Sequence, residues 1–434
     1  MDFSKSRALE QRLCRVIPGG AHTYAKGIDQ FPELSPGVIA RGSGCHVWDV
    51  DGNEFIEYGM GLRAVTLGHA YAPVVEAVRD SLPLGNNFTR PAAIELECAE
   101  AFLEIVSGAE MVKFTKDGST ADSAALKLAR QYTGRDMVAI CADQPFFSYD
   151  DWFMSTTTMD GGVLELEREL TVRFQYNDAE SLRRLFQAHP GRIAAVFMEA
   201  ARIVEPAPGF LEGVQAACRE FGAVLVFDEM ITGFRWHVGG AQALYGVVPD
   251  LSTFGKAVAN GFALSVLCGK RELMRLGSRE REQDNVFLLS TTHGAETPGL
   301  AAAIRTMQIY RTEPVIEHLH RQGERLAAGF REASARHGLE KHVEPVGRAC
   351  NLMFATRGPD GKPSQPFRTL FLQETIRRGV LMPSLVVSYS HSDADIDRTL
   401  EAIDGALAVY ARALSDGVDK YLVGRPSRVV FDRR

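Results

Sequence analysis

Lys256 has the sequence surroundings that best suit nucleophilic chemistry. It follows an apolar segment and a glycine within residues 249–261 (PDLSTFGKAVANG), and it is the sole lysine between Lys127 and Lys270. A lysine amine becomes nucleophilic near neutral pH when it is partly desolvated or lies beside another cation. The end of an apolar strand can supply that desolvation, although a surface lysine after a turn gives the same local pattern. Lys256 is therefore a candidate for covalent bonding to a carbonyl group.

An acidic residue ends a second apolar run upstream. Residues 223–227 (AVLVF) are followed directly by Asp228 and Glu229. The carboxyl ends of buried parallel strands face the crevice where α/β sheets bind ligands. A buried carboxylate at that place can hold the proton on a cofactor's ring nitrogen, or it can simply cap a turn or helix. Asp228 suits the first role.

A third candidate site precedes a predicted helix. Gly118, Ser119 and Thr120 stand where the helix should begin, and a helix start offers free N–H groups and a positive dipole end to a phosphate. Ordinary helix capping explains the same residues. The phosphate site, the carboxylate and the lysine nevertheless occur in this order, and together they favour pyridoxal 5'-phosphate (PLP), held by Lys256 as a Schiff base.

The elements that must position these residues alternate along the middle of the chain. Helices are predicted at residues 121–133 and 210–221, and strands at residues 137–142, 193–199 and 223–227. This alternation is typical of a mainly parallel, buried sheet with helical crossovers. The predicted fold class is α/β.

Regular elements also flank this region. They are a β-hairpin at 44–56, amphipathic helices at 315–337 and 367–378, a strand-like segment at 351–355 and a last helix at 392–414. We therefore expect three parts: an N-terminal segment with the hairpin (1–60), a large domain (61–311) and a small α+β domain (312–434).

Composition excludes several classes of partner. With 48 basic and 55 acidic residues the net charge is −7, so nucleic acid is not expected. No apolar run approaches the roughly 20 residues of a membrane-spanning helix, and the N-terminal residues lack the order of a signal peptide, so we expect a cytoplasmic protein without a membrane partner. The seven cysteines form no Cys-x-x-Cys pair and should be reduced thiols. No His or Cys spacing indicates a metal site.

Two motifs carry a resemblance to a known family. Residues 227–235 (FDEMITGFR) resemble the signature of class III aminotransferases, and residues 250–256 (DLSTFGK) resemble their cofactor-lysine motif. Within this group the sequence is most similar to glutamate-1-semialdehyde 2,1-aminomutase-like proteins. Supporting matches lie at residues 18–20, 48–54, 67–69, 176–178, 239–242 and 390–397. The resemblance implies a fold-type I PLP transferase, with a large domain whose mainly parallel sheet lies between helices and a small α+β domain.

The resemblance also assigns roles to individual residues. It implies that Lys256 forms the Schiff base and that Asp228 pairs with the pyridine nitrogen. Thr291 would reach the phosphate in the neighbouring subunit, which implies a homodimer with shared active sites. The remaining implied cofactor contacts are Gly118, Ser119, Thr120, Phe146, Phe147, Glu199 and Met230.

The departures from the family pattern concern the ring and the substrate. The usual Tyr-His-Gly run is missing, and Phe146 or Phe147 can supply the aromatic face that stacks on the ring. Lys26 stands where aminomutases have an arginine for the substrate carboxylate, and Leu62 beside Arg63 replaces an aromatic residue. Lysine does not reproduce the arginine fork. Lys26 and Arg63 still favour an anionic substrate, unless both are solvated surface charges.

The expected activity is transfer of an amino group between a small-molecule amino donor and a carbonyl acceptor. An aminomutase, which moves the group within one substrate, needs the same cofactor residues and is the alternative. A non-enzymatic descendant of the fold would be expected to have lost Lys256, Asp228 or the phosphate site, and this sequence has all three.

Overall fold

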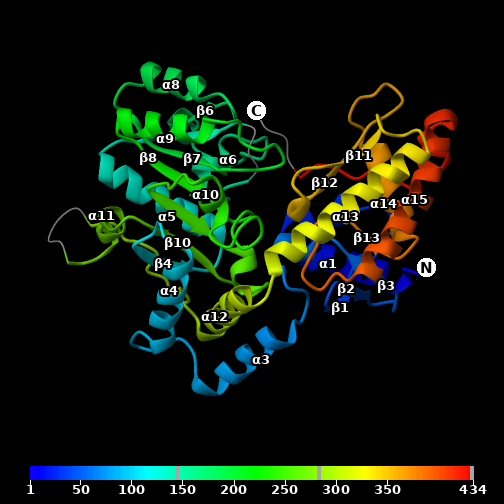
Figure 1. Cartoon of the computed structure of the whole chain (residues 1–434), viewed down its shortest axis with the longest axis horizontal. Helices are drawn as coiled ribbons and strands as arrows, with labels where there is room; N and C mark the ends of the chain where they lie inside the picture. The colour runs from blue at the N-terminus through cyan, green and yellow to red at the C-terminus, as the bar shows by residue number, and fades with distance from the viewer. Residues whose placement is uncertain (143–145, 281–284, 431–434) are drawn as a thin grey trace. The chain divides into compact units, whose positions relative to one another are not determined.

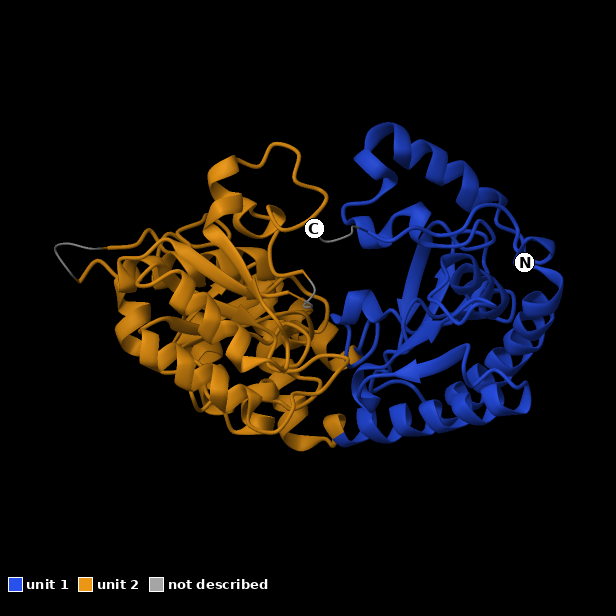
Figure 2. Cartoon of the chain, turned by 90° about the horizontal axis from the view of Figure 1, so that it is seen from above, with its two compact units in different colours: residues 1–71, 317–430 blue, residues 72–316, 431–434 orange. Residues whose placement is uncertain are grey.

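The computed structural model describes residues 1–142, 146–280 and 285–430, which form two compact units (Figure 1, Figure 2). One unit combines residues 1–71 with 317–430, and the other spans 72–316. The sequence predicts boundaries at 60/61 and 311/312 and a separate N-terminal segment. The structure groups the chain differently, because β13 (Val380–Leu381) pairs in parallel with β3 (Glu54–Glu57) and joins the first residues to the C-terminal part.

The unit of residues 72–316 is built on a seven-stranded sheet in the order β4-β10-β9-β8-β7-β5-β6. Its strands are β4 (Met111–Thr115), β5 (Met137–Cys141), β6 (Thr171–Phe174), β7 (Ile193–Met198), β8 (Val224–Asp228), β9 (Leu251–Phe254) and β10 (Ser265–Gly269). Parallel pairing joins β6, β5, β7, β8 and β9, whereas β10 runs antiparallel to β9 and β4. The predicted mainly parallel α/β sheet is confirmed, with one reversed strand.

Helices cover this sheet, so every residue of β5, β7, β8, β9 and β10 is buried. The helices are α3 (Ala72–Ser81), α4 (Ala93–Ile105), α5 (Gly118–Thr133), α6 (Asp151–Met154), α7 (Glu165–Leu170), α8 (Ala179–Ala188), α9 (Phe210–Phe221), α10 (Gly240–Tyr245), α11 (Arg271–Met274) and α12 (Thr297–Thr312). Short 3-10 turns are η4 (Leu82–Leu84), η5 (Lys256–Ala259) and η6 (Arg275–Gly277). Helix α5 packs across β4, β7, β8, β9 and β10, and α8 packs beside α9.

Local sequence explains both ends of α5. The side chain of Asp117 accepts a hydrogen bond from the Thr120 N–H at 2.9 Å, which caps the first turn. The helix ends at Gly134, whose φ of 65° lies in the left-handed region that favours glycine. The helix therefore begins at Gly118, earlier than the predicted residue 121, and its first turn contains the predicted phosphate residues.

The other unit contains a four-stranded sheet, a two-stranded sheet and long helices. Its strands are β1 (Ile39–Ser43), β2 (His46–Asp49), β3, β11 (Val343–Val346), β12 (Met353–Thr356) and β13. Its helices are α1 (Ser4–Val16), the short turn α2 (Met60–Arg63), α13 (Val315–Arg336), α14 (Gln365–Ile376) and α15 (Asp393–Asp416). Its 3-10 turns are η1 (Pro18–Gly20), η2 (Tyr24–Lys26), η3 (Ile28–Gln30), η7 (Ala349–Asn351) and η8 (Val418–Lys420). The predicted hairpin is β2–β3, and the Ser392–Asp395 capping box starts α15 as predicted.

The described helices do not include a candidate for a membrane-spanning segment. Across residues 1–142, 146–280 and 285–430, none of the helices combines the length and the apolar character needed to cross a bilayer.

Candidate active site

The ends of three neighbouring strands place the candidate site in the unit of residues 72–316. Asp228 ends β8 and lies opposite Thr253 of β9 in the parallel register. On the other side, Met198 of β7 pairs with Phe227, so Glu199 follows at the same edge of the sheet. Asp228 and Glu199 are both buried. This edge is the carboxyl end of the parallel strands, where α/β folds bind ligands.

Lys256 follows β9 by a single intervening residue. Gly255 is fully extended, and Lys256 itself adopts a φ of 46°, which a non-glycine residue rarely does. Such left-handed backbone costs about 1–3 kcal/mol and is concentrated at functional sites. The side chain is half-buried, which provides the partial desolvation expected from the sequence.

Asp228 lies in the electrostatic field of Lys256. Burial raises the pKa of the Asp228 carboxyl, and the Lys256 ammonium opposes that rise. The backbone N–H of Met230 also donates a hydrogen bond to Asp228 Oδ1 at 2.7 Å, which favours the ionised form. A buried carboxylate, a half-buried amine and a fixed N–H donor thus share one site.

The fully buried carboxyl group of Asp122 completes this cluster. Thr253 Oγ1 donates to Asp122 Oδ1 at 2.6 Å, and burial followed by the negative charge of Asp228 raises the pKa of Asp122. The sequence analysis did not single out either Asp122 or Thr253. One signal was present: Asp122 is a charged residue among Ala121, Ala124 and Ala125 on the buried face of α5.

Met230 connects the start of α5 to the residue before Lys256. A Cβ atom added at Gly118 would lie 3.0 Å from Met230 Sδ, and one added at Gly255 would lie 2.6 Å from the same sulfur. Neither position has room for a side chain unless Met230 moves and, at Gly255, Ser265 moves as well. The close approach brings the helix N-terminus, the strand-end lysine and Met230 together.

The predicted phosphate residues differ in their surroundings. The Thr120 hydroxyl and N–H both donate to Asp117, so helix capping, the alternative left open by the sequence, describes Thr120. Ser119 Oγ accepts from the Tyr149 N–H at 3.2 Å. The first N–H groups of a helix have no intrahelical acceptor, which leaves those of Gly118 and Ser119 suited to an anion. The Tyr149 hydroxyl, 3.2 Å from Thr120 Oγ1, is a further polar group at this helix start.

The two candidate stacking residues have different environments. Phe147 is buried in the hydrophobic core, with its ring 5.6 Å from that of Phe153 and 6.5 Å from that of Phe197. Phe146 is 44% exposed and contacts Phe153 edge-on. Phe146 therefore has the more accessible aromatic face.

Glu229, the acidic residue after Asp228, holds the local backbone in place. Glu229 accepts from the backbone N–H groups of Ala241 and Gln242 at 2.7 and 2.8 Å, and from the Thr232 hydroxyl. These contacts attach the turn after β8 to the start of α10. The signature FDEMITGFR therefore combines a site residue, Asp228, with a residue that fixes the local backbone.

Thr291 lies on the surface, apart from the internal cluster. It lines a hollow of about 690 Å³ together with Phe88, Leu96 and Phe114. Phe88 and Leu96 are exposed apolar side chains.

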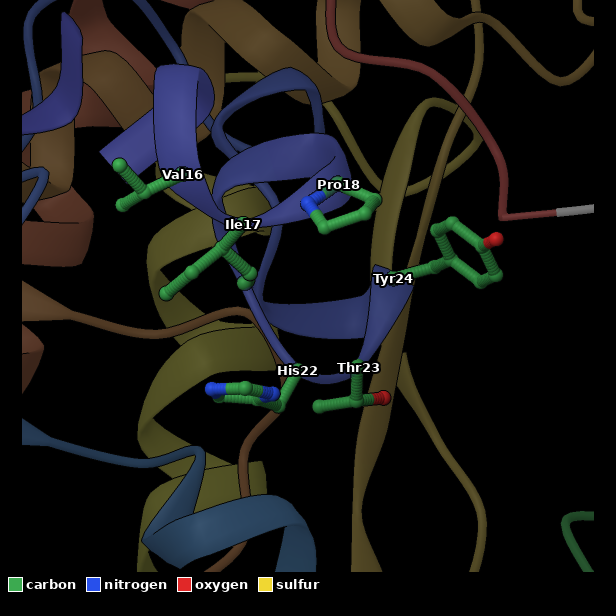
Figure 3. Close-up of a pocket in the computed structure, with 7 residues that line it drawn as sticks. Val16, Ile17, Pro18, His22, Thr23 and Tyr24 are labelled. Carbon is green, nitrogen blue, oxygen red and sulfur yellow. The ribbon is translucent and has the colours of Figure 1, made fainter. Parts of the chain in front are cut away.

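Lys26 and Arg63 belong to the unit of residues 1–71 and 317–430, not to the unit that holds Lys256. Arg63 donates through Nε to Asn351 Oδ1 at 2.7 Å and follows Met60 and Leu62, all three with positive φ. Lys26 is the last residue of η2. Tyr24, the first residue of η2, lines the hollow of about 320 Å³ shown in Figure 3. That hollow is lined by Val16, Ile17, Pro18, Ala21, His22, Thr23 and Tyr24.

Among the described residues, the fold gathers one group of potential metal ligands that the sequence spacing did not show. Cys45, His46 and Asp395 place ligand atoms within 4.8 Å of one another. His46 Nε2 already pairs with Asp395 Oδ1 at 3.0 Å, and Ser392 donates to the second oxygen of Asp395. These contacts attach the hairpin to the start of α15.

A fold-type I PLP-dependent enzyme is the class that this sheet and site define. The residues fit the cofactor, because an amine, a buried carboxylate and a helix N-terminus meet around Met230. Residues 31–407 match the aminotransferase class-III family, and the chain belongs to that family. PLP is its cofactor.

Several relatives align with nearly the whole chain. The chain is 32% identical over 429 residues to a glutamate-1-semialdehyde 2,1-aminomutase from Desulfatibacillum aliphaticivorans, covering 93% of this chain and 99% of the relative. The FumI protein of Sphingopyxis sp. MTA144, solved in its PLP internal aldimine form, is 29% identical with a TM-score of 0.87 over 98% of this chain and 100% of its own. An omega-transaminase from Sphaerobacter thermophilus is 25% identical with a TM-score of 0.82, covering 94% and 98%.

Proposed function

We propose that the enzyme transfers an amino group between an amino donor and a carbonyl acceptor, with Lys256 as the residue that bonds to PLP. The observation that carries the proposal is the meeting of Lys256, Asp228 and the start of α5 in one unit. PLP, when bound, supplies an aldehyde carbon that bonds to amines and a ring that withdraws electrons from the substrate.

Each side chain then has a defined task. Asp228, ionised, holds the proton on the pyridine nitrogen. Lys256 Nζ, once displaced by the substrate amine, would remove a proton from the substrate carbon that bears this amine and deliver it to the PLP carbon to which the lysine had been bonded. The first N–H groups of α5, at Gly118 and Ser119, bind the phosphate, and Phe146 covers the ring. Glu199 and Met230 form the remaining part of the cofactor site.

An aminomutase is the second candidate, and the 32% identical relative of that name supports it. The replacement of the expected arginine by Lys26 favours transfer between two substrates. The enzyme should be given a panel of amino donors with carbonyl acceptors, and separately glutamate 1-semialdehyde alone. Transfer requires both a donor and an acceptor and forms two products. Conversion of the single substrate into an isomer of equal mass would establish the aminomutase instead.

Substrate recognition is tested by neutralising Lys26 and Arg63 separately. If both contact an anionic substrate, Lys26→Met and Arg63→Met should each lower kcat/KM for anionic amino donors roughly ten-fold or more, as expected for a charge-assisted hydrogen bond. Neutral donors should be affected much less. Steady-state kinetics with a matched pair of donors measures this difference. Equal losses for both donors would assign the two residues to folding or to the surface.

We also propose a homodimer in which Thr291 completes the neighbouring subunit's phosphate site. Phe88 and Leu96 are exposed apolar side chains beside Thr291, and this supports a surface that the second subunit covers. All seven cysteines lie among the described residues and form no disulfide there, which supports the cytoplasm as the location.

Thr291→Ala is expected to weaken PLP binding without separating the subunits. Loss of one hydrogen bond to a charged group should lower PLP affinity roughly ten-fold. PLP titration of the apoenzyme measures the affinity, analytical ultracentrifugation measures the assembly, and Thr292→Ala is the matched neighbour. Unchanged PLP affinity in Thr291→Ala would remove this residue from the site.

A further inference from the structure

Two buried carboxyl groups from distant parts of the sequence lie within the electrostatic influence of Lys256. Asp122 lies in α5 and is fully buried, and Asp228 ends β8. Thr253, the strand neighbour of Asp228, donates to Asp122 Oδ1 at 2.6 Å. The packing of α5 on β8 and β9 therefore fixes the pair from both sides.

The Asp122 carboxyl group is buried with only part of its hydrogen-bonding capacity used. Asp122 Oδ2 is buried, and no N–H group or hydroxyl of the described residues donates to it. Asp228 lies opposite Thr253, whose hydroxyl donates to the first oxygen of Asp122, and the negative charge of Asp228 disfavours ionisation of Asp122. A fully buried carboxyl group whose second oxygen receives no hydrogen bond is favoured in its neutral, protonated form. A second negative charge near Asp228 in a buried site would also be repelled.

The surroundings decide which group holds the proton. Burial is the largest influence on Asp228 and raises its pKa, but the Lys256 ammonium and the Met230 N–H, which donates to Asp228 Oδ1, favour its ionised form. Burial is the largest influence on Asp122, and together with the negative charge of Asp228 it raises the pKa of Asp122 well above its usual value. The Thr253 hydroxyl and Lys256 oppose this rise to a lesser extent.

We propose that Asp122 holds the proton and donates it in a hydrogen bond to Asp228, which makes Asp122 a positioning residue for the carboxylate that contacts PLP. The proton on Asp122 is inferred from its burial, from its oxygen without a hydrogen bond and from the neighbouring Asp228, whereas the positioning role rests on the proposed function of Asp228. A neutral Asp122 orients Asp228 and supports its charge without placing a second negative charge beside Lys256. The asparagine variant should reproduce this arrangement, because its amide donates to Asp228 and accepts from Thr253.

The proton on Asp122 is tested in the apoenzyme by comparing wild type with Asp122→Asn. A carboxyl group whose pKa is higher in the folded than in the unfolded protein stabilises the fold below the unfolded pKa of about 4. This contribution is lost as the pH rises through the folded pKa. Asp228 and Lys256 face Asp122, and Glu229 acts on Asp228; all three are present in both proteins.

Urea unfolding of both apoenzymes between pH 5 and 8 should therefore separate them. The unfolding midpoint of wild type is expected to fall relative to that of Asp122→Asn as the pH rises, corresponding to about one additional proton held by the folded wild type. A difference between the two midpoints that stays constant across this range would overturn the proposal.

The positioning role is tested with PLP bound. Asp122→Asn should retain PLP affinity and the pH profile of the cofactor's absorbance, whereas Asp122→Leu should lose roughly ten-fold or more in affinity. Equal impairment in both variants, or none in Asp122→Leu, would contradict the role. If the apoenzyme difference is present but Asp228→Asn leaves the cofactor's absorbance unchanged, the proton on Asp122 stands and the cofactor role of Asp228 fails.

Discussion

Lys256→Ala is expected to abolish measurable turnover while leaving a folded protein that binds PLP weakly. Loss of the proton-transfer group alone should lower kcat by about 10²–10⁴-fold, and loss of the covalent attachment adds to this. The contacts from the start of α5 and from Asp228 do not depend on the lysine and should still hold the cofactor. Single-turnover kinetics, PLP titration and circular dichroism measure the three properties.

A matched lysine distinguishes this loss from a general effect of removing charge. Lys270 pairs with Asp250 at 2.5 Å on the surface, so Lys270→Ala should keep nearly wild-type activity. A small primary amine added to Lys256→Ala should recover part of the proton transfer. Substantial turnover by Lys256→Ala without added amine would contradict the proposed role.

Asp228→Asn is expected to have the second largest effect. A neutral amide cannot hold the proton on the pyridine nitrogen, so the ring withdraws electrons less effectively. We expect kcat to fall by roughly 10²–10³-fold, the size of effect seen when one preorganised electrostatic contact is removed from a transition state. PLP should remain bound, and its absorbance spectrum should change.

The adjacent carboxylate provides the control. Glu229 is equally buried but contacts the start of α10, so Glu229→Gln should lower the stability of the fold rather than the rate of the chemical step. We expect a loss of about 1–3 kcal/mol in the free energy of unfolding. Near-normal kcat in Asp228→Asn would exclude that residue from the mechanism.

The sequence predicted the elements whose patterns are local and strongly periodic. The helix at 210–221 matches α9, and the apolar runs ending at Asp228 and before Lys256 are neighbouring strands. The reversed direction of β10 and the edge strands β4 and β6 were not predicted, because a short apolar run carries no information on direction or on its neighbours. The pairing of β13 with β3 was also missed, because a two-residue strand has no periodicity and its partner lies far away in the sequence.

The candidate site was predictable where its residues end strands or start a helix. Thr120 shows the limit of such patterns, since the same hydroxyl can bind a phosphate or cap a helix, and in the structure it donates to Asp117. Asp122 and Thr253 meet only through the packing of α5 against β9. Local spacing could not reveal this pair, although an aspartate within an alanine-rich buried helix face is an unusual burial that requires a partner.

The central claim, that Lys256 carries the cofactor, is tested most directly by trapping. The wild-type enzyme loaded with PLP is reduced with borohydride and digested, and the peptides are sequenced by mass spectrometry. We expect the added mass of reduced PLP on the peptide that contains Lys256, at that side chain. Labelling of Lys116, Lys127 or Lys270 in place of Lys256, or the absence of any labelled peptide, would contradict the account.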